Sequence, residues 1–383
     1  MKTKIINIIK LILVFLPFIV VMVYSKFFAL AFFDNETPYY IWNREFCKTS
    51  HAENYRSLII GDSIANAAFI PEVLSESTLN LGLGGASPAE AYYIMSDWLT
   101  HNKAPEDVFI CFYDTNIERS TTFWVRTMYS HRFTPFQNLE IINNAARFGD
   151  NDIASSNRWF DFISYELYLP NKYITSICNG KVYKRLAKNR EALELIDLHR
   201  GRYIIATGTL PEIPPFEYTE FKVSGLFDHY YRQLIDLCLK NGCRVHLLKL
   251  PLPSDAVFTG EYIKTVNEYY DTLKKDYPGI DFEWFVEDYG HDCFCDPMHF
   301  NAHGALKFNT EVLKERYPDV FDNDMTDRQK EAIIYNIKND EPSREDLLKW
   351  CELGGLNVTE NNSGTHVTIT DPVSRSTIFE KDF

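Results

Sequence analysis

Short apolar runs alternate with amphipathic stretches through most of this chain. Five apolar runs bounded by turn residues predict buried strands of a parallel sheet, at Ser57–Ile60, Thr78–Leu81, Val108–Tyr113, Arg244–Leu250 and Ile280–Phe285. The stretches between and after them predict helices at Ile64–Leu74, Ser87–Leu99, Leu226–Lys240, Tyr262–Lys275 and Asn301–Glu315. This order predicts a doubly wound α/β sheet, in which ligands bind beyond the carboxyl ends of the strands.

The alternation is interrupted at about residues 117–218. This segment is rich in aromatic residues and arginine. We interpret it as a mostly helical insertion that forms a lid or a substrate platform, with ordinary core and surface as the alternative. Residues 321–383 predict a small C-terminal appendage, with a capped helix at Thr326–Lys338 and a hairpin at Val358–Ile369 that turns at Asn361–Gly364. The main domain therefore covers residues 35–320, and Asp34–Tyr55 reads as a polar connector containing aromatic residues.

Residues 1–34 form the most apolar part of the chain. The segment Ile5–Phe33 exceeds the roughly 20 residues that a helix needs to span a bilayer. Lysines lie before and early in this segment and acidic residues follow it, which places the N-terminus in the cytoplasm and the rest outside. We therefore expect a single-pass membrane anchor. A cleaved signal peptide, with Ala29–Ala31 as the cleavage site, and a buried core helix are the alternatives.

Composition narrows the function classes. The net charge of -14 and the pI near 5.2 argue against a nucleic-acid partner, because phosphate binding needs a basic surface. Hydrophobic residues make up 45% of the chain, which is too many for a disordered protein. Eight cysteines in 383 residues do not indicate a small disulfide-rich scaffold, and Cys111 and Cys238 fall at apolar, core-like positions.

Candidate chemistry lies at two distant places in the chain. Ser63 follows the first predicted strand, while Asp296 and His299 stand three residues apart, just before a helix capped by Asn301. In this arrangement Ser63 is the nucleophile, His299 the base and Asp296 the residue that orients the imidazole. The alternatives are that Ser63 only caps a helix, that Asp296 and His299 form a structural loop pair, or that His303 is the base.

An acyl-transfer site also needs donors for a developing oxyanion. The backbone N–H of Ser63 is one candidate, and the N–H of Gly84 or Gly85 is a second. The side-chain amide of Asn116 is a third. All of these residues follow predicted strands and are therefore expected at the same edge of the sheet.

A metal site is the main chemical rival. Four residues of zinc-ligand type lie within nine positions: His291, Cys293, Cys295 and His299. The Cys-x-Cys spacing is narrower than in structural zinc knuckles, and a metal on His299 would remove the proposed base. We therefore expect no metal and no cofactor.

Three short motifs resemble the blocks of the SGNH (GDSL-type) hydrolase superfamily. They are Gly61-Asp62-Ser63, the loop Gly82–Gly85, and Asp296-Pro297-Met298-His299 followed by Asn301 and Gly304. The resemblance implies a flavodoxin-like sheet, ester-type acyl chemistry, the Ser63–His299–Asp296 triad, and oxyanion positions at Gly84 or Gly85 and at Asn116. The third block departs from the family pattern Gly-x-Asn-Asp, because this chain has Tyr113-Asp114-Thr115-Asn116.

An N-terminal anchor before such a domain further resembles DltD-type D-alanyl transfer proteins and the accessory proteins of alginate O-acetylation. That resemblance implies a membrane-anchored, extracytoplasmic serine acyl-transfer enzyme acting on O-acyl groups (acetyl or D-alanyl) of a cell-surface glycopolymer, beside a membrane-bound O-acyltransferase. An esterase or deacetylase of the same fold, and a non-catalytic partner of the membrane acyltransferase, are the alternatives.

Overall fold

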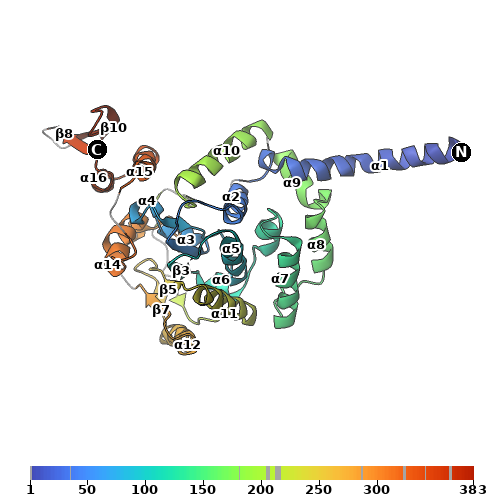
Figure 1. The fold of residues 1–383 in the computed structure, drawn as a ribbon, viewed down its shortest axis with the longest axis horizontal. Helices are drawn as coiled ribbons and strands as arrows, with labels where there is room; N and C mark the ends of the chain where they lie inside the picture. The colour runs from blue at the N-terminus through green and yellow to red at the C-terminus, as the bar shows by residue number, and fades with distance from the viewer. Residues whose placement is uncertain are drawn as a thin grey trace.

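The centre of the molecule is a five-stranded parallel sheet (Figure 1). The computed structural model describes residues 2–34, 36–180, 182–203, 208–211, 217–285, 288–321, 325–340, 342–361 and 365–383, without the side chains of residues 2–9, 11, 182 and 183. The strands are β1 (Ser57–Gly61), β2 (Thr78–Asn80), β3 (Asp107–Cys111), β5 (Arg244–Lys249) and β7 (Asp281–Trp284). Their order is β2-β1-β3-β5-β7, which is the flavodoxin-like order. The predicted α/β class and all five predicted strands are confirmed.

Helices cover both faces of the sheet, because side chains alternate between the faces along each strand. Leu58, Ile60 and Ile110 belong to one core, with residues of α2 (Thr37–Lys48), α5 (Pro88–His101), α11 (Gly225–Lys240) and α12 (Gly260–Asp276). Ile59 and Phe109 belong to the other core, with residues of α3 (Ser63–Ala68), α4 (Pro71–Leu74), α13 (Ala302–Lys307) and η4 (Phe308–Leu313). The sheet is therefore wound on both sides.

Capping residues set the starts of several helices. Ser87 and Glu90 form a capping box at the start of α5, and Thr326 and Gln329 form another at the start of α15 (Asp327–Asn339). The Asn301 side chain accepts a hydrogen bond from the Gly304 N–H at 2.9 Å and so begins α13. The caps at Thr326 and Asn301 were predicted from the sequence.

The segment 117–218 is helical over most of its described residues. It contains η2 (Phe123–Met128), α7 (Pro135–Phe148), α8 (Arg158–Glu166), α9 (Pro170–Asn179) and α10 (Val182–Leu198), and it follows the short α6 (Asp114–Glu118). It ends in β4 (Glu217–Tyr218), which pairs in parallel with β6 (Val257–Phe258). Two of its side chains, Arg126 and Tyr203, line the cavity beside Ser63.

The N-terminal helix α1 (Lys2–Phe27) extends away from the rest of the molecule, and the short η1 (Ala29–Ala31) joins it to the domain (Figure 1). Apolar side chains of α1 face solvent, including Leu13, Val14 and Phe18, which are 53–64% exposed. Among the residues that the structure describes, no helix meets the length and hydropathy needed to cross a membrane.

The C-terminal part adds α15, α16 (Arg344–Leu353) and a three-stranded antiparallel sheet. Strand β9 (His366–Thr370) lies between β8 (Asn357–Glu360) and β10 (Thr377–Asp382). Strands β8 and β9 form the predicted hairpin, although residues 362–364 of its predicted turn lie outside the described residues. Helix α16 and strand β10 were not predicted.

Candidate active site

The nucleophile position is set by the sharp passage from β1 into α3. A Cβ on Gly61 would lie 1.8 Å from the Cys111 carbonyl oxygen of the neighbouring strand, so only glycine fits there. Asp62 follows, and its carboxylate accepts a hydrogen bond from the Ile64 N–H at 3.0 Å as the cap of α3. Ser63 is thus the first residue of the helix, at the carboxyl end of β1, which lies between β2 and β3 in the sheet.

The Asp62 carboxylate also holds the end of β3. Its other oxygen accepts hydrogen bonds from the Tyr113 N–H at 2.8 Å and from the Asn116 amide at 2.6 Å. Asp62 is fully buried, and burial raises its pKa above the ordinary value. The structure therefore places the Asn116 amide on Asp62, where it supports the Ser63 turn.

Ser63, His299 and Asp296 form one hydrogen-bonded chain. His299 Nε2 lies 2.7 Å from Ser63 Oγ, and His299 Nδ1 lies 2.7 Å from an Asp296 oxygen. The second Asp296 oxygen accepts the backbone N–H groups of Met298 and His299, both at 2.9 Å, which fixes the loop. Burial alone would raise the pKa of Asp296, but the hydrogen bond and the charge of His299 lower it below the ordinary value. Asp296 is thus ionised at neutral pH and can stabilise an imidazolium.

Backbone N–H groups are available beside the serine. Within the described part of the chain, the N–H groups of Ser63, Gly84 and Gly85 donate to no other protein group. Gly84 lines the same cavity as Ser63 and His299. These N–H groups are therefore free to bind a negatively charged oxygen.

The cavity over Ser63 is small, at about 110 Å³. Six residues line it that were not predicted to belong to the site: Glu36, Tyr39, Tyr40, Asn66, Arg126 and Tyr203. At its mouth, Arg126 forms an ion pair with Glu36 at 2.8 Å, so the two charges largely compensate. The wall is otherwise built from tyrosine rings and backbone.

Helix α2 supplies part of that wall, although its residues were interpreted from the sequence as a connector. The Tyr39 hydroxyl donates to the Gly82 carbonyl, and the Tyr40 hydroxyl donates to the Gly84 carbonyl at 2.5 Å. The Asn66 amide donates to the Tyr39 hydroxyl at 2.7 Å. The buried positions of α2 include Tyr39, Tyr40, Asn43 and Cys47, and this helical spacing is the signal in the sequence that could have revealed the helix.

The alternative base, His303, makes its hydrogen bond away from Ser63, and so does His291 of the predicted zinc-ligand set. His303 Nδ1 bonds Asp346 at 2.8 Å, and His291 Nε2 lies 2.9 Å from Asp255. His299 is engaged by Ser63 and Asp296.

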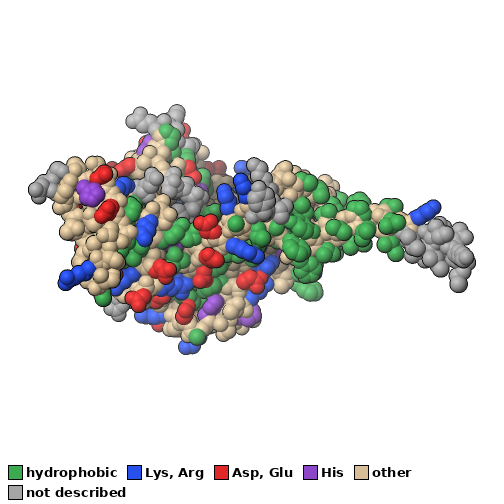
Figure 2. Space-filling model, turned by 90° about the horizontal axis from the view of Figure 1, so that it is seen from above, with side chains coloured by type: hydrophobic (Ala, Val, Ile, Leu, Met, Phe, Trp, Pro, Cys, Tyr) green, Lys and Arg blue, Asp and Glu red, His purple; other side chains and the backbone are tan. Residues whose placement is uncertain are grey.

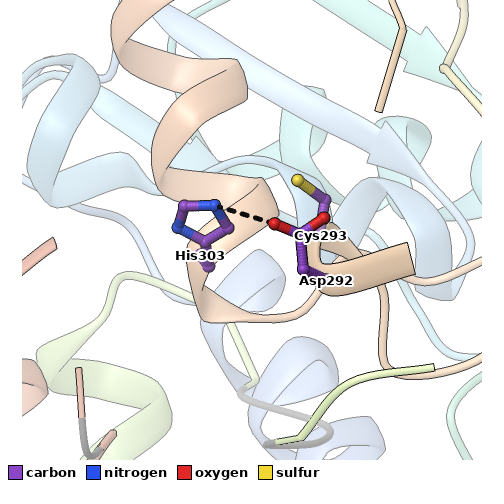
Figure 3. A group of neighbouring side chains, drawn as sticks. All are labelled: Asp292, Cys293 and His303. Carbon is purple, nitrogen blue, oxygen red and sulfur yellow. Dashed lines mark ion pairs between the residues drawn. The ribbon is translucent and has the colours of Figure 1, made fainter. Parts of the chain in front are cut away.

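Among the described residues, a different trio has ligand atoms close together, namely Asp292, Cys293 and His303. Figure 3 shows His303 facing Asp292 across 3.9 Å. Because the Asp292 side chain is 70% exposed, we do not propose this trio as a metal site.

The hydrogen bonds of His303 nevertheless lead us to expect that the stability of the protein depends on pH. The hydrogen bond to Asp346, followed by that to Cys293, raises the pKa of His303 to about 10. A raised pKa in the folded state contributes stability below the unfolded value of about 6.5, and this contribution is lost as the pH rises toward 10. We expect wild type to exceed His303→Gln in unfolding free energy at pH 6, and the difference to shrink by pH 10. Urea unfolding at both pH values measures it, and a constant difference would contradict the prediction.

The hydrogen bond of Asn116 to Asp62 predicts how the variant Asn116→Ala will behave. Asn116→Ala removes one donor from a buried carboxylate, which should lower the unfolding free energy by about 2 kcal/mol. Because the amide faces Asp62, kcat should fall less than tenfold. A loss of an oxyanion donor would instead lower kcat by about 10²–10³-fold. Urea unfolding and kcat for a small acetyl ester, measured on the same preparation, separate the two roles.

No protein-family model matches this sequence, and the search of curated proteins also found no match.

Proposed function

We propose that this protein is a serine acyl-transfer enzyme that uses Ser63, His299 and Asp296 as its catalytic residues. The observation that carries the proposal is the continuous hydrogen-bonded chain from Ser63 Oγ through both imidazole nitrogens to Asp296, with 2.7 Å at each link. The three residues come from opposite ends of the domain, and a helix cap alone would not require His299 at the serine hydroxyl.

In the proposed reaction, His299 Nε2 takes the Ser63 proton while Ser63 Oγ attacks the carbonyl carbon of an ester. The negatively charged oxygen binds the N–H groups of Ser63 and of the Gly84–Gly85 loop. His299 then protonates the leaving alcohol, which leaves an acyl group on Ser63. A second hydroxyl, deprotonated by His299, attacks this acyl group, and His299 returns the proton to Ser63 Oγ as the serine leaves. Asp296 stabilises the imidazolium in both steps.

The cavity supports a short acyl group. A space of about 110 Å³, walled by Tyr39, Tyr40 and Tyr203, suits acetyl or D-alanyl and is too small to enclose a long fatty chain. Because Glu36 is paired with Arg126, this end of the cavity is close to neutral, which is compatible with an acetyl group.

We further propose an SGNH-type fold, an extracytoplasmic location and α1 as the membrane anchor. The flavodoxin-like strand order and the motif at Gly61-Asp62-Ser63 support the first proposal. The lysines before the apolar segment, and the solvent-facing apolar side chains of α1, support the others. The acyl acceptor is then the hydroxyl of a cell-surface glycopolymer, and the protein works beside a membrane-bound O-acyltransferase.

A serine-directed phosphonate tests the nucleophile. We expect the full chain in detergent to form a covalent adduct, seen by mass spectrometry, and Ser63→Ala to form none. Ser156→Ala is the matched control, because Ser156 is an exposed serine of the insertion and should leave labelling unchanged. Equal labelling of Ser63→Ala and wild type would remove Ser63 from the proposed mechanism.

An acceptor competition separates transfer from hydrolysis. The labelled acyl-enzyme is mixed with buffer alone or with a soluble oligosaccharide, and the acyl product is followed. We expect the oligosaccharide to accelerate deacylation and to carry the acyl group. Release to water at the same rate with and without oligosaccharide would instead make the protein an esterase.

A further inference from the structure

A solvent-exposed apolar surface lies on the helices α8 and α9. Trp159, Phe160, Ile163 and Leu167 are 46–62% exposed, and Ile174 on α9 is 39% exposed. Trp159, Ile163 and Leu167, the last at the C-cap of α8, are spaced four residues apart and so follow one side of this helix. The opposite side of this helix, with Ser164 and Tyr165, packs into the domain. We refer to these five exposed residues as the α8–α9 surface. A gathered patch of this kind marks a binding surface.

The α8–α9 surface is continuous with the base of α1. Helix α9 packs against α1, and Figure 1 places α8 and α9 beside the point where α1 leaves the domain. Aromatic rings lie at this junction: Tyr24 of α1 stacks on Phe28, just after the helix, at 5.3 Å, and Phe32 meets Tyr173 of α9 at 6.4 Å. In Figure 2, hydrophobic side chains continue from the projecting helix onto the adjoining part of the domain.

Cations lie at the border of this apolar region, each over an aromatic ring. The Arg158 guanidinium lies 5.5 Å from the Trp159 ring, and the Lys26 ammonium lies 5.8 Å from the Phe27 ring. Phe27 itself is 70% exposed. Tryptophan with neighbouring arginine or lysine is typical of the layer where lipid headgroups meet acyl chains, since the ring enters the apolar layer and the cation stays at the phosphates.

The exposed side chains of α1 identify the occupant as lipid. Ile12–Leu16 and Phe18–Val20 are exposed almost without interruption, so this stretch of the helix is apolar on every side. A partner helix would cover one stripe of α1, whereas a bilayer covers every side at once. A surface that continues from such a helix meets the same environment.

We propose that the α8–α9 surface inserts into the interfacial layer of the bilayer that holds α1, so that the domain lies on the membrane in one orientation. The ligand is a phospholipid surface, with acyl chains around Trp159 and Phe160 and phosphates near Arg158 and Lys26. This inference rests on the proposed membrane attachment of α1 and is independent of the acyl chemistry.

Quenching of tryptophan fluorescence by brominated lipids tests the inference. The full chain is reconstituted in phosphatidylcholine–phosphatidylglycerol vesicles with plain or brominated acyl chains. The emission of Trp159 is obtained as wild type minus Trp159→Phe. We expect brominated lipid to reduce this difference at least twofold. The matched control carries Trp159→Phe together with Val373→Trp, because Val373 is 90% exposed on the C-terminal part, far from α1 in Figure 1. The emission of the new tryptophan should not change.

Flotation of the vesicles distinguishes this inference from the proposed anchor. If the protein floats with the vesicles but its Trp159 emission is not quenched, the inference is overturned and the proposed anchor is retained. Chain that does not float would contradict both. Equal quenching at positions 159 and 373 would also overturn the proposed orientation.

Discussion

Replacing His299 with alanine is expected to lower kcat for a small acetyl ester by about 10⁴-fold or more. His299 Nε2 is 2.7 Å from Ser63 Oγ, and without it the serine hydroxyl has no base at neutral pH. The free N–H groups of Ser63 and the Gly84–Gly85 loop remain in the variant. Activity should therefore stay above the uncatalysed rate, and KM should change little. Steady-state kinetics with detergent-solubilised full chain measures both constants.

The matched control for this prediction is His366→Ala. His366 lies on β9 of the C-terminal sheet and bonds Asp382 at 2.7 Å, so its loss should leave kcat unchanged. Added imidazole should partly restore His299→Ala, because it can occupy the vacated space and accept the Ser63 proton. A fall in kcat of less than tenfold would show that His299 is not the base.

Replacing Gly201 with alanine is expected to lower the unfolding free energy by about 4 kcal/mol or more. Gly201 has φ +88°, which an L side chain rarely adopts, and a Cβ there would lie 1.9 Å from the Asn80 carbonyl oxygen. The Gly201 carbonyl also accepts the Asn66 amide at 2.9 Å. Backbone displacement at this turn should thus disturb the wall of the catalytic cavity as well. Urea unfolding followed by circular dichroism measures the loss.

Gly242→Ala separates the two causes of that loss. Gly242 has a similar φ of +81°, but no atom lies within 4 Å of the Cβ that alanine would add. Gly242→Ala therefore introduces only backbone strain, which should lower the unfolding free energy by about 1–2 kcal/mol. Equal losses for the two variants would show that the contact between Gly201 and Asn80 is unimportant.

The sequence predicts the central sheet well because each strand is a short apolar run that ends in turn residues. Ser57–Ile60 and Val108–Tyr113 had to be strands, since both of their faces are buried and neither run is long enough for a helix. Because parallel strands bring their carboxyl ends to one edge, Ser63 could be placed there before any coordinates. Ser63 and His299 are 236 residues apart in the chain, and the parallel strand order brings them to the same edge of the sheet.

The walls of the cavity could not be predicted in the same way. Tyr39 and Tyr40 meet the Gly82–Gly85 loop only through contacts across the fold, and nothing near them in the chain indicates this. Asn116 illustrates the limit for side-chain direction. Its position after β3 was predicted correctly, but the direction of its amide depends on the buried carboxylate of Asp62, which competes for it. Position along a strand is local information, whereas side-chain direction depends on the neighbours.

The short connection between α1 and the cavity limits how far the reactive serine can stand from a membrane. Only nine residue steps separate Phe27, the last residue of α1, from Glu36 at the cavity mouth. Even a fully extended chain of that length reaches about 30 Å. With α1 in a bilayer, the chemistry is confined to a shallow zone above the headgroups. If the acceptor is the glycopolymer proposed above, its distal parts would lie beyond this zone, so acyl groups would be added near the attached end or during synthesis.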